Sequence, residues 1–172
     1  MNIEERSEII RLLESSREEV NAAVRGLQEA LASAKPDPAR WSVLECLEHI
    51  ATVEERFLGR LENAQLQDEA RVDRAREAEL ATRATNRSTR IQAPEPAIPK
   101  GRFASVKQAL DHFNATRART LQFVHDRGAD LYRLAAEHPR FGSVNGKEVL
   151  LIIAGHAQRH AEQIREITVA AA

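Results

Sequence analysis

The sequence has little of several features that would point to particular classes of protein. With Cys46 as its single cysteine, it can form neither an intramolecular disulfide nor a Cys-x-x-Cys redox pair or thiolate-rich zinc site. No apolar run reaches 18 residues, so we expect no membrane-spanning helix. The formal net charge is only -1 although 30% of the residues are charged, which gives no basis for binding the phosphates of a nucleic acid.

The N-terminus also lacks the features of a targeting segment. The first ten residues, MNIEERSEII, are acidic and polar and do not resemble a signal peptide. Together with the lone cysteine, they predict a cytoplasmic protein. A chain of 172 residues is long enough for one domain with a substantial core, and no short internal repeat divides it. We therefore expect residues 1–172 to form a single domain.

Few residues are available to interrupt helices, since the chain has only seven glycines and six prolines. Alanine, leucine, glutamate and arginine are abundant, and apolar residues recur at helical spacing in four segments. The four apolar stripes are Ile9, Leu13, Val20, Val24, Leu27 and Leu31; Val43, Leu47, Ile50, Phe57 and Leu61; Val106, Leu110, Phe113, Leu121 and Val124; and Val149, Ile152, Ile153, Ile164 and Ile167. Each stripe predicts one long amphipathic helix.

The ends of these helices carry recognisable signals. Pro36 and Pro38 end the first helix, and Gly128 suits the end of the third. The starts are predicted at Ser42 with Glu45, at Ser105 with Gln108, and at Asn145 with Glu148, and the last helix should continue to about Val169.

The remaining segments are predicted to connect the helices. The polar sequence beyond Leu61 should extend the second helix outside the core, and the turn-rich residues 85–102 form a long connection that could order against the bundle. Residues 130–144 are predicted to be a connection with one helical turn, and we expect no paired strands. The sequence thus predicts an all-α protein, a four-helix bundle with a long crossover connection between its second and third helices.

The last helix places two histidines in its apolar stripe, within the segment GHAQRH. His156 and His160 are four residues apart, so both rings lie on the same face of the helix. Burying an unpaired polar group costs about 1–3 kcal/mol, so each ring needs partners. A single histidine would be interpreted as a core residue bonded to a carbonyl, but two that face the same way favour a shared metal ion.

A third ligand has to come from another helix. His49 lies at the edge of the second stripe and could face the last helix, whereas His112 and His125 project away from the third stripe. Three histidines would leave a position open for water or substrate, as in catalytic rather than closed structural sites. Gln163, one turn beyond His160, could orient a ligand.

Other sites built on histidine are disfavoured. HAQRH has the spacing of the zinc protease motif, but Ala157 stands where that motif needs its glutamate base. No Glu-x-x-His pair of the di-iron bundles occurs. A haem held by His49 and one histidine of the pair would leave the other without a role.

Two charged residues occupy apparent core positions, Glu54 in the second stripe and Arg117 in the third. A buried ion pair between helices is the favoured interpretation, and the alternative places Glu54 near a metal as a base. The arginine-rich residues 71–90 could bind an anion, but the interspersed acids favour a solvated helix.

Three segments resemble the DinB-like, or YfiT-like, family of metal-binding four-helix bundles. They are WSVLECLEHIATVEERF, PKGRFASVKQALDHFNATRARTLQFV and HPRFGSVNGKEVLLIIAGHAQRHAEQI, which together span most of Trp41 to Ile167. In that family a histidine of the second helix and a His-x-x-x-His pair of the last helix bind a divalent metal. The matching positions are His49, His156 and His160, the same three that the helical pattern indicates.

The resemblance implies nickel or zinc, an open coordination site and a homodimer. The family includes thiol transferases that use bacillithiol, mycothiol-dependent isomerases and members described only as metal-dependent hydrolases. We therefore expect a metal-dependent thiol S-transferase or hydrolase that acts on a small-molecule substrate, with a low-molecular-weight thiol as possible cosubstrate. The alternative is a non-catalytic, dimeric, stress-related metal-binding bundle. Neither reading involves nucleic acid or a membrane.

Overall fold

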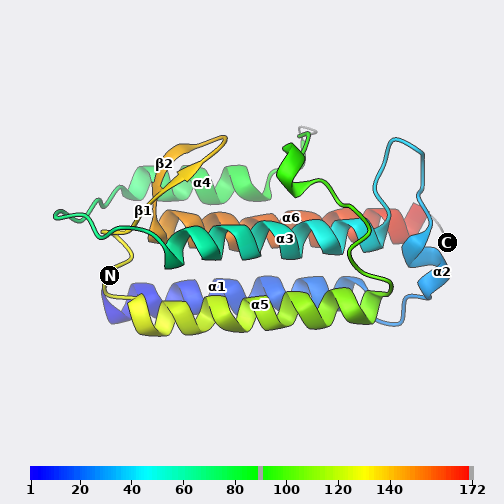
Figure 1. Cartoon of the computed structure of the whole chain (residues 1–172), viewed down its shortest axis with the longest axis horizontal. Helices are drawn as coiled ribbons and strands as arrows, with labels where there is room; N and C mark the ends of the chain where they lie inside the picture. Colours follow the sequence, from blue (N-terminus) through cyan, green and yellow to red (C-terminus); the bar gives the residue numbers. More distant parts are fainter. Residues whose placement is uncertain (89–90, 171–172) are drawn as a thin grey trace.

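The computed structural model describes residues 1–88 and 91–170, in which four long helices lie side by side (Figure 1). Thr89 and Arg90, in the predicted connection, and Ala171 and Ala172, at the end of the predicted domain, lie outside the described residues. The long helices are α1 (Ile3–Ala23), α3 (Val43–Glu62), α5 (Val106–Arg127) and α6 (Gly146–Ala170). Helices α1 and α3 each pack against both α5 and α6, which confirms the predicted four-helix bundle with its crossover between α3 and α5.

Local capping explains where these helices begin. In the predicted boxes at the starts of α3 and α6, both reciprocal hydrogen bonds are present, and α1 begins with a third box. At the start of α5 only half of the predicted box forms, because Gln108 accepts a hydrogen bond from Ala104 rather than from Ser105. Gly128 ends α5 as predicted but in a right-handed conformation, and a side chain there would collide with Arg6.

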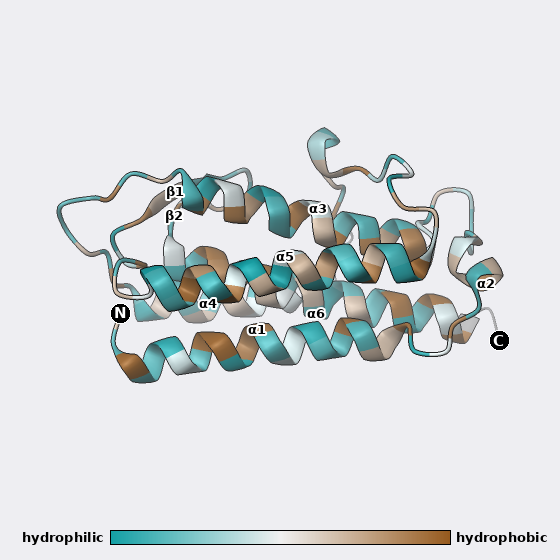
Figure 2. Cartoon of the chain, turned by 60° about the horizontal axis from the view of Figure 1, so that its bottom comes forward, coloured by the Kyte–Doolittle hydropathy of each residue, from teal (hydrophilic) through white to brown (hydrophobic). Residues whose placement is uncertain are grey.

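Two apolar clusters fill the bundle, and a layer of buried polar side chains lies between them. The first cluster includes Leu13 and Leu58, and the second includes Val20 and Leu47. The alternation of hydrophobic and hydrophilic residues around each long helix, visible in Figure 2, is that of amphipathic helices. Within the described residues, no helix combines the length and hydrophobicity needed to cross a bilayer.

The polar layer contains the predicted ion pair. Arg117 of α5 donates to both carboxylate oxygens of Glu54 on α3, over 2.7 and 2.8 Å. It also donates to Ser16 Oγ over 2.8 Å and to the carbonyl of Leu13, so it joins α1 to the other two helices. Thr120 Oγ1 donates to Glu54 over 2.8 Å. The structure therefore bears out the ion-pair interpretation of Glu54.

The prediction that the first helix continues through Leu31 is wrong. Helix α1 ends at Ala23, and a short helix, α2 (Glu29–Ser33), follows it. Gly26 between them has φ +73, in the left-handed region that interrupts a helix and that glycine adopts without strain. Leu27 and Leu31 continue the apolar spacing, but they do so on the turn and on α2.

The predicted extension of the second helix beyond Leu61 is also wrong. Helix α3 ends at Glu62, and after a turn-rich segment α4 (Arg74–Thr85) lies along α6 (Figure 1). Two ion pairs attach this polar region to the first turn of α6: the buried pair of Lys147 with Glu77 over 2.8 Å, and the pair of the buried Glu148 with the exposed Arg71 over 2.7 Å. The arginines described in this region pair with carboxylates. Arg83 finds its partner, Glu79, inside the region, but other partners lie on α1 and α6: Glu5, Glu148 and Glu166.

A close approach of α4 to α6 depends on Gly155. A Cβ atom added there would lie 2.7 Å from the Cβ of Ala84. No real pair of carbon atoms packs at that distance, so any larger residue would move α4 away from α6. The glycine before His156 thus allows α4 to cover that part of the helix.

We expect Gly155→Ala to lower the free energy of unfolding by about 1–3 kcal/mol, because it overpacks this contact. The matched control is Gly59→Ala, also within a helix but with nothing within 4 Å of the added Cβ. In that control the free energy of unfolding should rise by about 0.5–1 kcal/mol, because alanine has a higher helix propensity than glycine. Urea denaturation of both variants measures the difference in stability. Adding Ala84→Gly to the Gly155→Ala protein should restore its stability, because it removes the methyl group that the new Cβ would meet. A Gly155→Ala protein as stable as the control would contradict the close packing.

The absence of strands was a further incorrect prediction. Strands β1 (Ala135–His138) and β2 (Gly142–Asn145) pair antiparallel as a short hairpin. Its turn is stabilised by His138 Nδ1, which accepts the backbone N–H groups of Arg140 and Phe141 over 3.0 and 3.2 Å. Gly142 has φ +67, and the His138 ring stacks on Phe57 of α3. These turn and ring contacts hold the hairpin against α3.

Candidate metal centre

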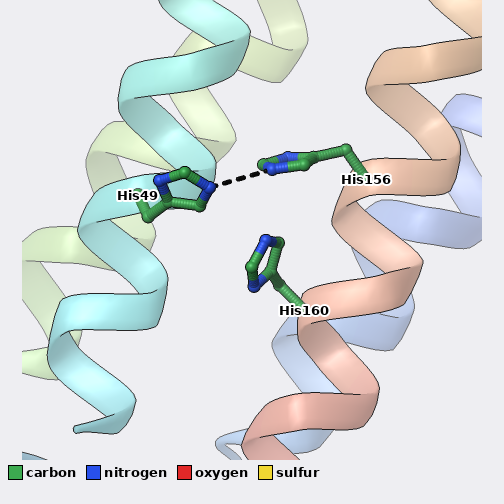
Figure 3. Close-up of side chains that lie close together, drawn as sticks. All are labelled: His49, His156 and His160. Atoms are coloured by element: carbon green, nitrogen blue, oxygen red, sulfur yellow. Dashed lines mark hydrogen bonds between the residues drawn. The ribbon is translucent and has the colours of Figure 1, made fainter. Parts of the chain in front are cut away.

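Three imidazole rings converge between α3 and α6 (Figure 3). His49 projects from α3, and His156 and His160 project from successive turns of α6. Their candidate ligand atoms all lie within 4.8 Å of one another, and Nε2 of His49 is 3.0 Å from Nε2 of His156. The structure therefore brings together the three histidines that the sequence singled out.

The position of the rings follows from the packing of the two helices. On α6, His156 lies between Ala154, in the first apolar cluster, and Ala157, in the second. His49 and His160 are buried, with 5% and 6% of their surface exposed, while His156 is partly exposed. The group thus lies inside the bundle, where the two apolar clusters meet.

Hydrogen bonds to the outer nitrogens fix the tautomers of two rings. His49 Nδ1 is 2.7 Å from the carbonyl oxygen of Ala97, which can only accept, so Nδ1 carries the proton and Nε2 is unprotonated. This Nε2 then accepts the 3.0 Å hydrogen bond from Nε2 of His156. His160 Nδ1 donates in the same way to Gln163 Oε1 over 2.9 Å. Gln163 therefore orients His160, in the role that the sequence suggested. Two of the rings present an unprotonated Nε2, the form in which histidine binds a metal.

The surroundings keep all three rings neutral. Burial lowers the pKa of His49, and burial together with the neighbouring histidines lowers the pKa values of His156 and His160 well below the usual range. Neutral imidazoles, unlike imidazolium ions, carry no extra proton that has to be released to solvent before they coordinate. The donor set therefore fits a divalent metal ion.

The residues around the three histidines limit which other side chains could bind a metal ion there. The ring of Trp41 lies 4.7 Å from that of His49 and stacks near His160. Cys46 is buried one turn before His49, and burial raises its pKa to about 12, so it remains a protonated thiol. The candidate centre consists of imidazoles, without a thiolate.

Part of the predicted connection does order against the bundle beside this centre. It contains a short 3-10 helix, η1 (Glu95–Ala97), which lies above α3 in Figure 1 and supplies the carbonyl that holds His49. The other histidines lie elsewhere. His125 is exposed as predicted, His112 is partly buried beside Arg102, and His138 is in the hairpin. No residue in the sequence of the connection indicates that one of its backbone carbonyls contacts His49.

Without metal, the protein should lose stability as the pH falls from about 6.5 to 5. Histidines of the unfolded chain take up protons near pH 6.5, whereas the buried rings, whose pKa values are lowered, stay neutral. The unfolded state then binds more protons, and acid favours it. Urea denaturation in the presence of a chelator measures this change. Metal retention should fall in the same range, because protons compete for the ligands.

One variant identifies part of the source of that pH dependence. His138, whose pKa burial lowers to about 4, contributes in the same window, so His138→Gln should remove its share. Stability that stays constant between pH 7 and 5 would contradict the burial of neutral rings.

Comparisons with known proteins agree with this architecture. The sequence model of the DinB superfamily matches residues 12–164. A search of curated proteins gave no significant match. Solved structures that share the fold include the following two. YfiT from Bacillus subtilis has a TM-score of 0.63 and 13% identity, covering 98% of this chain and 89% of that one. TT2238 has a TM-score of 0.60 and 22% identity, covering 94% of this chain and 98% of that one.

The two similar structures are both four-helix bundles. YfiT is described as a probable metal-dependent hydrolase with an unusual four-helix bundle topology, and TT2238 as a four-helix bundle protein. At these sequence identities the likeness concerns the fold. The family match spans most of the chain, from within α1 to the last turns of α6. The chain therefore belongs to the DinB superfamily, as its sequence motifs predicted.

Proposed function

We propose that this protein is a metal-dependent enzyme that activates a small nucleophile, either water or a low-molecular-weight thiol. His49, His156 and His160 would hold the divalent metal, nickel or zinc. The observation that carries the proposal is the convergence of three neutral imidazoles from two helices, two of them with Nε2 unprotonated. The reaction class is hydrolysis or thiol S-transfer on a small electrophilic substrate.

Three uncharged ligands suit this chemistry. A divalent ion held by neutral imidazoles keeps its full charge and lowers the pKa of a bound water or thiol, which yields a nucleophile near neutral pH. The protein's contribution is orientation: the Ala97 carbonyl holds His49, Gln163 holds His160, and the Trp41 ring packs beside both. Burial of His49 and His160 restricts water around them, and the more exposed His156 marks the side where a small molecule could approach.

The comparisons support a hydrolase or transferase to different degrees. YfiT, which shares the fold, is described as a probable metal-dependent hydrolase. The sequence motifs resemble a family that includes thiol transferases. Both reactions need a nucleophile that the metal would activate, and they differ in whether that nucleophile is water or a thiol.

A metal analysis followed by a substrate screen tests the proposal. The protein as purified should contain about one nickel or zinc ion per chain, measured by inductively coupled plasma mass spectrometry. Metal-loaded and chelated samples are then compared with ester, amide and electrophilic substrates, with and without low-molecular-weight thiols. Turnover that needs metal and thiol identifies an S-transferase, and turnover that needs metal alone identifies a hydrolase. Stoichiometric metal without turnover favours the non-catalytic bundle, and absence of metal binding overturns the proposal.

We also propose that the protein is a cytoplasmic homodimer, as the family resemblance implies. Several large apolar side chains are exposed outside the core and would be available to an interface; they include Ile3, Leu31, Leu66, Val72, Ile91, Ile98 and Val169. Light scattering coupled to gel filtration distinguishes a mass of two chains from that of one.

A further inference from the structure

Glu48 precedes His49 on α3, and its carboxylate is buried, with 5% of the residue exposed. The partners of this carboxylate are three successive backbone N–H groups of the α3–α5 connection. Lys100 donates to Oε1 over 2.6 Å, and Gly101 and Arg102 donate to Oε2 over 3.1 and 2.9 Å. Hydrogen bonds to a charged acceptor are about twice as strong as those between neutral groups.

These three N–H groups converge because of the backbone conformation at Gly101. Its φ is +77, in the left-handed region that favours glycine. A left-handed residue between two ordinary ones turns consecutive N–H groups toward one point and forms an anion-binding concavity. The carboxylate of Glu48 occupies the concavity formed by residues 100–102.

The same segment also contacts His49. The carbonyl of Ala97, three residues before Lys100, accepts the Nδ1 proton of His49 over 2.7 Å. Adjacent residues of α3 thus hold the two ends of residues 97–102: His49 binds the first end and Glu48 binds the last. The contacts form a closed ring in which movement of one end would displace the other.

We propose that Glu48 is a positioning residue for His49. By anchoring residues 100–102, its carboxylate keeps the Ala97 carbonyl on Nδ1 and so holds the proton there. Nε2 of His49 then stays unprotonated and directed toward His156. The anchored segment is a fixed part of the centre and does not open as a lid over His49. The consequence for metal affinity rests on the proposed function, whereas the consequence for the tautomer holds in the metal-free protein.

Nitrogen-15 NMR of the metal-free protein tests the tautomer directly. In the parent protein His49 should show a protonated Nδ1 and an unprotonated Nε2, assigned by the loss of these signals in His49→Asn. In Glu48→Gln the amide cannot accept three N–H groups as a carboxylate does, so His49 should populate both tautomers. Metal affinity, measured by competition with a chromophoric chelator, should fall about 10–100-fold, as is usual when the partner of a ligand is lost.

A second variant tests the contact between Glu48 and residues 100–102 by changing the backbone segment instead of the carboxylate. Gly101→Ala meets nothing within 4 Å, so its effect comes from φ +77 alone, and it should disturb His49 as Glu48→Gln does. Gly26→Ala is the matched control, with φ +73, equally open space and a position at the α1–α2 turn. Glu55→Gln is a further control, because it changes only the side-chain contacts of Glu55, the 2.8 Å ion pair with Arg102 and the 3.6 Å contact with His112. Both controls should leave the His49 tautomer and the metal affinity unchanged.

The outcomes separate this inference from the proposed function. If His49 keeps Nδ1 fully protonated in both Glu48→Gln and Gly101→Ala, Glu48 does not position it and the inference is overturned. If the tautomer changes in these two variants but not in the controls, the inference stands, even for a protein that binds no metal. Should Glu48→Gln fail to fold, the comparison of Gly101→Ala with Gly26→Ala still decides.

Discussion

Replacing His156 by alanine is expected to lower the affinity for the metal about 100-fold while the protein stays folded. Structural zinc sites with four ligands have apparent binding free energies of about 10–16 kcal/mol, so one ligand contributes roughly 3 kcal/mol, or about 100-fold in affinity. Of the three rings, His156 is the most exposed, so its truncation disturbs the core least. Metal analysis and chelator competition should show the loss of affinity.

The control for this experiment is His125→Ala. His125 lies on α5 with 76% of its side chain exposed, and its removal should leave metal content and affinity at the parent values. Added metal should raise the melting temperature of the control but not of His156→Ala, because a ligand that binds only the folded state stabilises it. Parent-like affinity in His156→Ala would show that the metal binds elsewhere.

Truncating Glu54 to alanine is expected to lower the free energy of unfolding by about 3–5 kcal/mol, the usual effect of breaking a buried ion pair. Arg117, whose side chain is fully buried, would lose both oxygens of its carboxylate partner and remain as an uncompensated charge. Because Arg117 also contacts Ser16 and Leu13, the substitution would weaken the packing of α1 as well as that between α3 and α5. Equilibrium urea denaturation measures the change.

Glu62→Ala is the matched control, because Glu62 pairs with Arg119 between the same two helices, α3 and α5, but at the surface. Exposed ion pairs contribute about 0–1 kcal/mol, so this variant should be close to the parent in stability. The folded Glu54→Ala protein should bind metal as the parent does. Unchanged stability combined with weakened metal binding would instead assign Glu54 to the metal centre.

The sequence predicted the long helices well because their signals are local. The start of α3, for example, needs only Ser42 and Glu45 three residues apart, followed by an apolar stripe. The three histidines could be found for a similar reason, since helical spacing places His156 and His160 on one apolar face. That these rings converge on His49 of α3 is now seen in the structure, and metal ligation by them stays a prediction.

Features that depend on contacts between distant segments were missed. Helix α4 has a weak apolar stripe, and its attachment relies on ion pairs such as Lys147 with Glu77 and on the space left by Gly155. The hairpin strands have four residues each, too few to show an alternating pattern, and one contact that holds them is the stacking of His138 on Phe57. In such a contact, the sequence around one residue does not indicate which distant residue it will touch.

The surroundings of the candidate centre were missed for a different reason. Backbone groups carry no residue identity, so neither the carbonyl that holds His49 nor the N–H groups that bind Glu48 can be inferred from residue types. In the sequence, Gly101 was the one residue that could have indicated this backbone arrangement. A glycine after Pro-Lys in a turn-rich segment is typical of many loops, however.

His49 and His156 are 107 residues apart along the chain. A metal ion shared between them would act as a reversible cross-link that closes a loop of more than half the protein. Closing a flexible loop of that length costs about 4 kcal/mol in chain entropy, so an unfolded chain would hold the ion only through the local pair on α6. Metal release and separation of α3 from α6 would therefore be coupled, and the loaded bundle would resist unfolding as one unit rather than helix by helix.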